Sequence, residues 1–169
     1  CELINRRVVS NYDEIKKEVV INVNSLFRGK TFTHMIDILI ILFTNAFYHS
    51  GYIDNLSDLV MNFEMTETDT DIILKVQNNL AEFVNKKELK ETVLDIQQKL
   101  EECIRNREYY NYEGKSGYIK ICKILECNLS CQSYMEFGLT VEENAYYIMI
   151  EMPKRGMIRK EVQNESVVN

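Results

Sequence analysis

Clusters of basic residues, long apolar runs and regularly spaced cysteines are all missing from this sequence of 169 residues. Its 20 Lys and Arg are outnumbered by 26 Asp and Glu, which gives a formal net charge of −6, and the basic residues form no patch along the chain. This argues against nucleic acid as the main partner, because such binding depends on clustered Lys and Arg. The longest apolar run covers residues 38–43. It is far shorter than the roughly 20 residues that span a bilayer, so we expect no membrane partner.

The five cysteines follow no disulfide or metal-binding pattern. Cys127 and Cys131 are separated by three residues, but no second pair and no nearby His completes a zinc site. We therefore expect buried free thiols in a reducing, cytoplasmic compartment. No signal peptide is evident, and the chain opens on Cys1 without a Met. We accordingly expect it to be part of a longer protein.

The most informative stretch is an amphipathic segment that starts near Thr33 and ends at Gly51. On a helical wheel at about 100° per residue, one face is apolar and the opposite face is a narrow polar arc. The polar arc comprises His34, Asp37, Thr44, Asn45 and Tyr48. Ile41 is the single apolar residue within it, and the arc contains neither Lys nor Glu. We predict that this arc lines a cavity; the alternative is an ordinary amphipathic helix with an incidental polar face.

The segments around this central helix are predicted from their periodicity. Residues 12–27 show helical spacing of Ile and Val, so the sequence predicts a helix that ends at Gly29. Runs 59–65 and 71–77 alternate apolar and polar residues around a short polar turn, which is typical of an antiparallel hairpin. The same pattern predicts a second hairpin from runs 133–139 and 145–152.

Two further helices are expected between the hairpins, over residues 81–107 and 118–126. A seam of apolar residues along the first comprises Leu89, Val93, Ile96, Leu100 and Cys103. This seam packs either on the domain's own sheet, which we favour, or against a partner helix. Blocks of strands and helices predict an α+β fold, namely a two-layer α/β sandwich with one mixed sheet and helices packed on one face. Residues 1–29 are expected as an N-terminal strand and helix extension, 30–153 as the domain, and 154–169 as a disordered tail.

Residues 44–50 read TNAFYHS and resemble the N-box of the histidine-kinase-like ATPase superfamily, which includes gyrase B, histidine kinases and MutL. In that family a helix of the form L-x-x-N-A-x-x-H-S/T presents its Asn to a Mg²⁺ ion held between nucleotide phosphates. The resemblance implies this metal-binding role for Asn45, and a cap or phosphate-side contact for His49. The chemistry is reasonable, because an amide oxygen can orient the ion while the triphosphate supplies most of the charge.

The order of elements over about residues 30–153 also matches the superfamily, and a second motif follows in family order. Residues 76–80 read VQNNL where the family has V-x-D-N-G. In the family, the Asp accepts a hydrogen bond from the adenine amino group. Asn78 replaces that Asp and can still accept through its carbonyl oxygen. The resemblance therefore implies a base site near Asn78 and Asn79. Leu80 replaces a Gly that lets the backbone approach the base, and could obstruct the site.

Residues 113–125 stand where the family has its G2 box, G-x-G-L-G-L-x-I-x-K-x-I. The second half of this box matches well, whereas only Gly114 and Gly117 remain of the glycine turn. With Lys115 and Ser116, these two glycines combine backbone donors, a positive charge and a helix start, which suits phosphate groups. As a P-loop the turn fails, because the preceding Gly and the strand–loop–helix context are missing.

The catalytic residues are where the sequence departs most from the superfamily. There, a Glu or similar polar residue one helical turn before the N-box Asn activates the attacking group. Here that residue is Ile41, which cannot accept a proton. Asp37 lies one further turn away, about 6 Å along the helix axis, and is too distant to substitute. His34 is expected to be structural, and no phosphoacceptor His is evident. We therefore assign no catalytic residue to this ATPase- or kinase-like chain.

Together these features imply an ATP-binding-type regulatory module with degenerate motifs, that is, a pseudokinase or pseudo-ATPase. It would belong to a larger signalling or stress-response system. Its expected ligands are ATP and Mg²⁺, and its expected partner is another protein or another domain of a larger chain. One alternative is an active serine/histidine-type protein kinase of the partner-switching kind. The other is a nucleotide-free interaction scaffold that uses the seam between Leu89 and Cys103.

Overall fold

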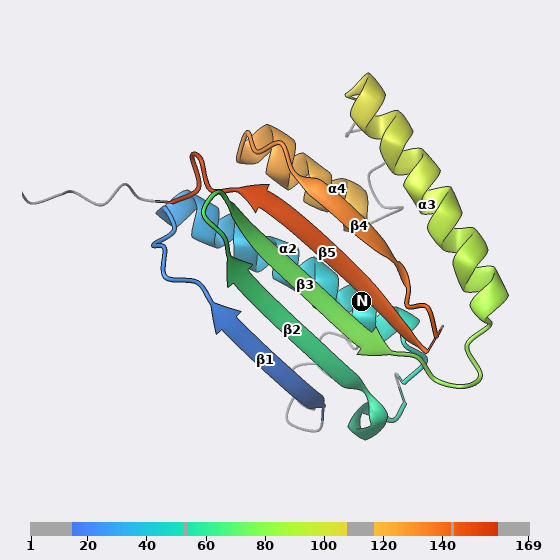
Figure 1. Ribbon diagram of the computed structural model, residues 1–169. Helices are drawn as coiled ribbons and strands as arrows, with labels where there is room; N and C mark the ends of the chain where they lie inside the picture. Colours follow the sequence, from blue (N-terminus) through green and yellow to red (C-terminus); the bar gives the residue numbers. More distant parts are fainter. Residues whose placement is uncertain (1–14, 53, 108–116, 143, 159–169) are drawn as a thin grey trace, which may run out of the picture.

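The computed structural model describes residues 15–52, 54–107, 117–142 and 144–158. Its central feature is one five-stranded sheet in the order β1-β2-β3-β5-β4 (Figure 1). The strands are β1 (Lys16–Asn22), β2 (Val60–Glu67), β3 (Asp71–Asn79), β4 (Tyr134–Leu139) and β5 (Ala145–Pro153). β1 runs parallel to β2, whereas every other neighbouring pair is antiparallel. The sheet is therefore mixed, as predicted.

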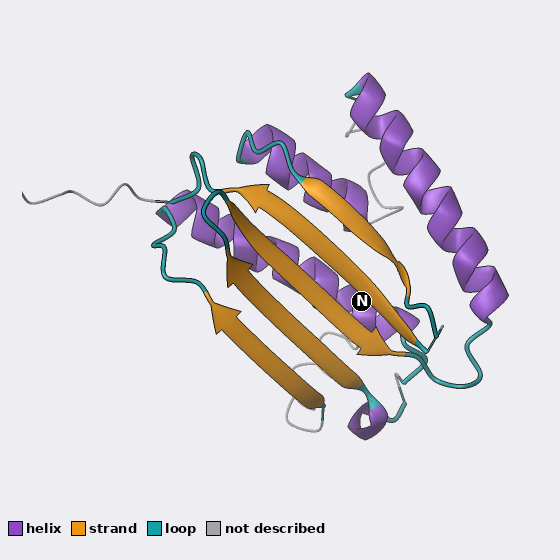
Figure 2. Cartoon of the chain, viewed as in Figure 1, coloured by secondary structure: helices purple, strands orange, loops and turns teal. Residues whose placement is uncertain are grey.

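Three helices lie on one side of this sheet (Figure 2). They are α2 (Gly29–His49), α3 (Lys86–Asn106) and α4 (Gly117–Lys123), with short helical turns η2 (Leu56–Asp58) and η3 (Ile124–Asn128) beside them. The four strands predicted from alternation all belong to the one sheet. The predicted α+β sandwich with helices on one face is thus confirmed.

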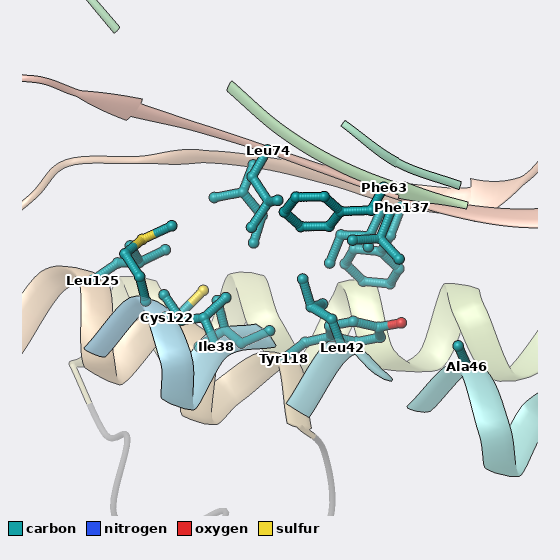
Figure 3. Packing of buried hydrophobic residues seen from close by; sticks show 14 of the residues in the cluster. Ile38, Leu42, Ala46, Phe63, Leu74, Tyr118, Cys122, Leu125 and Phe137 are labelled. Carbon is teal, nitrogen blue, oxygen red and sulfur yellow. The ribbon is translucent and has the colours of Figure 1, made fainter. Parts of the chain in front are cut away.

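The core lies between the sheet and helices α2 and α4. Alternate residues of β3 are buried, as period-two alternation requires. Figure 3 shows Leu74 and Phe63 of the sheet facing Ile38 and Leu42 of α2, with Cys122 of α4 beside them. Burying each large apolar side chain stabilises the fold by roughly 1.5–3 kcal/mol. By length and composition α2 could span a membrane, but its packed face makes it the core helix of this domain.

The helix predicted over residues 12–27 is wrong. Residues Lys16–Asn22 form the edge strand β1, and Gly29 begins α2 instead of ending a helix. Val19 and Ile21, which the helical spacing would have placed in a core, remain 55% and 60% exposed. Three consecutive β-branched residues favour the extended conformation, and pairing with β2 decides the outcome.

Helix α3 packs on its own domain through the predicted seam, which confirms the favoured interpretation. Val93, Leu100 and Cys103 are buried, and the other two seam residues are partly buried against the core. The Gln97 side chain donates from Nε2 to the carbonyl oxygen of Phe137 on the edge strand β4, at 3.1 Å. The helix starts later than predicted because Asn85 caps it by accepting from the Glu88 N–H. The seam is therefore occupied within the domain.

Three of the cysteines are buried free thiols, as expected: Cys103, Cys122 and Cys131. Burial raises the pKa of Cys122 to about 12 and that of Cys131 to about 11, which keeps both thiols protonated. Cys127 is exposed, so the expectation was wrong for this residue. Within the described residues, no three His, Cys, Asp or Glu side chains gather as a metal site.

Residues 154–158, which belong to the predicted disordered tail, pack onto the domain in the structure. Met157 is 1% exposed, and its carbonyl oxygen accepts from the Arg28 N–H at 3.0 Å. Ile158 forms an antiparallel bridge with Phe27. The closing segment is thus tied to the entrance of α2. The remainder of the predicted tail, 159–169, lies outside the described residues.

Glu67, at the end of β2, joins three segments of the chain. Its Oε2 atom accepts from the N–H groups of Asn24 at 2.7 Å and Ser25 at 2.9 Å, and the Ser25 hydroxyl donates to Oε1. Lys154 forms an ion pair with the same carboxylate. Lys154 first, and then the Ser25 donors, hold the pKa of Glu67 at about 2. The anion therefore fixes the loop after β1 and the segment after β5 against β2.

Glu67→Gln is expected to lower the midpoint of thermal unfolding at pH 7, because the folded state binds the Glu67 anion in preference to the neutral acid. This stabilisation is complete above about pH 4.5 and is lost as pH falls towards about 2, since the folded pKa is the lower one. Thermal unfolding followed by circular dichroism from pH 7 to 2 measures it. Glu64→Gln, an exposed neighbour on the same strand, is the control. Equal midpoints at pH 7, or a difference that grows on acidification, would contradict the assignment.

Helix α4 begins at Gly117, where it packs too closely on α2 to accommodate a side chain. A Cβ atom on Gly117 would lie 2.6 Å from Ile41 Cγ2 and 3.0 Å from Asn45 Nδ2. Both neighbours belong to α2 and are one helical turn apart. The absence of a side chain at Gly117 therefore sets the distance between the two helices.

Gly117→Ala is expected to destabilise the protein by about 1–3 kcal/mol, the usual effect of overpacking. Ile41→Ala removes the Cγ2 atom that would clash with the new Cβ. The double variant should therefore recover part of the lost stability, with a coupling energy of about 0.5–3 kcal/mol. Chemical denaturation of the four proteins in the cycle measures this coupling. Additive effects of the two substitutions would show that Ile41 does not limit the contact.

Candidate functional site

A cavity of about 460 Å³ opens between α2, α3, α4 and strands β3 and β5. Its size is within the range of small-molecule sites, about 300–1,000 Å³. Its apolar walls include Leu42, Val76, Leu80, Val93 and Ile148. Polar groups reach it from all five of these elements: Thr44, Asn45, Tyr48, His49, Asn78, Thr92, Asp95, Tyr118, Lys120 and Tyr146. The C-terminal half of the predicted polar arc thus lines a cavity, whereas His34 and Asp37 are not among the lining residues.

Asn45 lies where α2 meets the start of α4. Its amide rests against the Gly117 backbone, since both amide atoms would be within 3.3 Å of a Cβ there. The amide also lies beside the Tyr118 hydroxyl, where it counteracts part of the rise in the pKa of Tyr118 that burial causes. These contacts hold the Asn45 side chain in the cavity wall.

Tyr118 and Tyr146 form a hydroxyl pair next to Asn45. The Tyr118 hydroxyl donates to that of Tyr146 at 2.9 Å. The Tyr118 ring stacks on Phe137, with centroids 4.4 Å apart and planes at 22°. Burial raises the pKa of Tyr118 to about 12, and burial likewise raises the pKa of Tyr146. Both hydroxyls therefore stay protonated at neutral pH.

Asn78 lies in the cavity wall on β3, opposite Tyr146 in the β3–β5 register. It is 4% exposed, and its Nδ2 donates to the carbonyl oxygen of Asn79 at 2.9 Å. This bond leaves Oδ1 of Asn78 as the available acceptor. Leu80 is 8% exposed and lines the cavity. Its side chain forms part of the wall, and the cavity remains open beside it.

Asn79 is not among the cavity-lining residues. Its Oδ1 accepts from the Val60 N–H at 2.8 Å, and its Nδ2 donates to the Asp58 carbonyl oxygen at 2.9 Å. Both ends of the amide therefore support the start of β2. The structure gives Asn79 a structural role instead of bringing it to the base site.

His49 and Gly117 reach the cavity, while the rest of the glycine turn cannot be placed. His49 is exposed at the cavity mouth, where partial desolvation lowers the pKa of its imidazole. The ring is therefore neutral at pH 7. Gly114, Lys115 and Ser116 lie outside the described residues. Gly117, the last residue of the turn, adjoins Asn45.

Ile41, one helical turn before Asn45, contributes no polar group to the cavity. Ile41 packs on Gly117 and is not a lining residue. His34 Nδ1 lies 3.4 Å from Asp37 Oδ2, on the preceding part of the same helix. Only one carboxylate, Asp95, lines the cavity among the described residues, and it pairs with Lys99. This donor set suits Mg²⁺ only when an anionic ligand supplies most of the oxygens.

Several lining residues could not be identified from the sequence. Lys120 follows Gly117 by one helical turn, but nothing in the sequence distinguishes it from other surface lysines. Thr92 and Asp95 reach the cavity because α3 lies over it. Tyr118 and Tyr146 come together only when α4 and β5 pack. No local sequence pattern identifies these residues as cavity-lining, because the cavity wall forms only when separate elements pack together.

No protein-family model matches the sequence. Among curated proteins, the chain is similar to the Detocs histidine-protein kinase DtcA of Enterobacter cloacae, with 29% identity over 146 residues. The match covers 85% of this chain and 12% of that kinase. The chain therefore corresponds to a small part of its relative.

Solved structures with the same fold include the nucleotide-free catalytic domain of histidine kinase ThkA, at a TM-score of 0.52 and 17% identity, covering 90% of both chains. ThkA in complex with the response regulator TrrA matches at 0.51 and 18% identity, over 92% of this chain and 40% of that one. Acinetobacter baumannii histidine kinase AdeS matches at 0.50 and 8% identity, over 90% and 61%. The chain therefore has the fold of histidine kinase catalytic domains.

Proposed function

We propose that this domain binds ATP together with Mg²⁺ and acts as a regulatory module of a larger cytoplasmic signalling or stress-response system. The observation that carries the proposal is the convergence of Asn45 and Asn78 in one cavity. They come from a helix and a strand that are separated by a turn and a further strand. An accidental resemblance at each motif would not bring both amides to the same space.

In the proposed complex the base lies near Asn78 and the phosphates lie between Asn45 and the turn of residues 114–117. The bond from Asn78 Nδ2 to the Asn79 carbonyl leaves Oδ1 to accept from an adenine amino group. Val76, Leu80 and Ile148 supply apolar surface for the base. Adenine fits this arrangement, because guanine presents an acceptor where adenine presents its amino donor.

Asn45 would hold the metal through its amide oxygen, and the nucleotide would supply the anionic ligands that the cavity lacks. Mg²⁺ supplies the positive charge that keeps the phosphate groups together. Lys120, also in the cavity wall, adds a positive charge from α4. The absence of a side chain at Gly117 lets the phosphates approach the backbone beside Asn45.

The same geometry supports a domain with little or no hydrolytic activity. A general base must come within hydrogen-bonding distance of the attacking group, about 2.6–3.2 Å. Ile41 has no polar atom and packs on Gly117. Asp37 interacts with His34 instead of lining the cavity. We infer that nucleotide occupancy, more than turnover, is what this domain reports.

A protein partner is the other part of the proposal. ThkA was solved with the response regulator TrrA bound to it, which supports a partner protein for a domain of this fold. The second candidate, an active protein kinase, is favoured by the similarity to the histidine-protein kinase DtcA. The scaffold alternative loses its proposed surface, because the α3 seam is packed within the domain. A phosphotransfer assay with candidate partner proteins distinguishes the regulatory module from the active kinase.

Titration calorimetry with ATP is expected to show binding that Mg²⁺ strengthens. Asn45→Ala should remove that strengthening, because the amide oxygen is the proposed metal ligand, and Lys115→Ala should weaken binding with or without Mg²⁺. Asn62→Ala, on an exposed position of β2, is the control. A thermal shift provides a second readout, since ligand at a hundred times its Kd adds about 2.7 kcal/mol of stability. No heat and no thermal shift at millimolar ATP would overturn the proposal.

Steady-state ATP hydrolysis by the unmodified domain is expected to be very low, since loss of a positioned general base typically reduces a rate by about 10²- to 10⁴-fold. Ile41→Glu should raise turnover. The double variant Ile41→Glu with Asn45→Ala should not, because it lacks the proposed metal ligand. Phosphate release measured on the purified proteins decides this. Substantial hydrolysis by the unmodified domain that disappears in Asn45→Ala would place a base elsewhere in the cavity.

A further inference from the structure

We propose that Asp95 is a specificity-determining residue that recognises the ribose of the bound nucleotide. Its carboxylate accepts hydrogen bonds from the 2′- and 3′-hydroxyl groups, which makes the cavity selective for nucleotides that carry both. The inference rests on the proposed function, because it concerns the same cavity and the same ligand. It assigns a role to a residue that no sequence motif singled out.

Asp95 lies on α3, the wall of the cavity that neither end of the proposed nucleotide uses. The base is placed at Asn78 on β3, and the phosphates at Asn45 on α2 and the start of α4. The sugar joins base and phosphates, so it must cross the space between these ends. α3 borders that space with lining residues from Leu89 to Ile96, and Asp95 is one of them. It is therefore the wall left to contact the sugar.

The hydrogen-bond donors of ATP match this assignment. They are the adenine amino group and the two ribose hydroxyls, whereas the ring nitrogens and the ionised phosphates only accept. Asn78 accepts from the amino group in the proposed complex, so the hydroxyls are the remaining donors. A carboxylate only accepts, and its charge repels the phosphates. The sugar is thus the part of ATP that suits Asp95.

The Asp95 carboxylate is positioned by its own helix and keeps acceptor capacity. Lys99, one turn further along α3, forms an ion pair with its Oδ2 atom, which leaves Oδ1 for a ligand. Thr92, one turn earlier, also lines the cavity. Its hydroxyl donates to the Glu88 carbonyl oxygen at 2.9 Å, so its oxygen can only accept from a ligand. Acidic residues bind ribose hydroxyls in the same way in dinucleotide-binding folds.

The test compares binding of ATP and 2′,3′-dideoxy-ATP by titration calorimetry in Mg²⁺. The unmodified domain should bind ATP about 10-fold more tightly, at the lower end for a hydrogen bond to a charged group, because the Asp95 side chain is 56% exposed. Asp95→Ala should abolish this preference, and Asp95→Asn should keep part of it, since an amide oxygen still accepts. The ratio of the two affinities cancels any general change in repulsion, because both ligands carry the same phosphates.

Two further variants of α3 are the controls. Glu91→Gln removes a carboxylate one turn away that does not line the cavity. Lys99→Gln breaks the ion pair but leaves the Asp95 carboxylate in place. Both should retain the preference for ATP. Thermal unfolding followed by circular dichroism checks that every variant folds like the unmodified domain.

The outcomes separate this inference from the proposed function. Equal binding of the two nucleotides by the unmodified domain, a preference that survives in Asp95→Ala, or its loss in either control would overturn the role of Asp95 alone. Equal weakening of both nucleotides in Asp95→Ala, seen in Mg²⁺ but not in EDTA, would assign the carboxylate to metal-bound water and would also overturn the ribose contact. Absence of ATP binding at millimolar concentration would overturn the proposed function, and the inference with it.

Discussion

The close contact between α4 and α2 at Gly117 is the constraint on which the site depends. It brings α2 and the start of α4 together, and it does so because Gly117 has no side chain to separate them. Ile41 and Asn45 share this contact from successive turns of α2. The packing that stabilises the two helices therefore also fixes the proposed metal ligand, and a change to one of these residues affects fold and site together.

The same contact gives a physical reason for the departure at Ile41. A Glu there would bring a carboxylate against the Gly117 backbone, where desolvation is costly unless a partner is supplied. An Ile fills the space and adds apolar contact. On the other side of Asn45, the Tyr118–Tyr146 pair supplies hydroxyls in a wall that is otherwise largely apolar. The site thus has well-ordered polar groups for binding but, among the described lining residues, no free carboxylate suited to act as a base.

Much of the architecture could be predicted from local patterns. Alternation in residues 59–65, 71–77, 133–139 and 145–152 gave four strands, because each has one face on the core and one in solvent. The pattern failed at β1, where Val19 and Ile21 lie at an exposed sheet edge, so their spacing carries no information about a core. It also failed at Met157, which is buried by contacts with segments distant in sequence and not by any local periodicity.

For the site, the sequence by itself determined which chemical groups are present and in what order: the amides of Asn45 and Asn78, the apolar Ile41, and a Gly at residue 117. These are properties of single residues and of helical spacing, which local sequence encodes. Tertiary structure alone decided which of them meet. It placed Asn78 in the cavity wall but engaged both ends of the Asn79 amide at the start of β2. It also brought Tyr118 to Asn45, since such contacts arise from the packing of separate elements and leave no periodic signal in the chain.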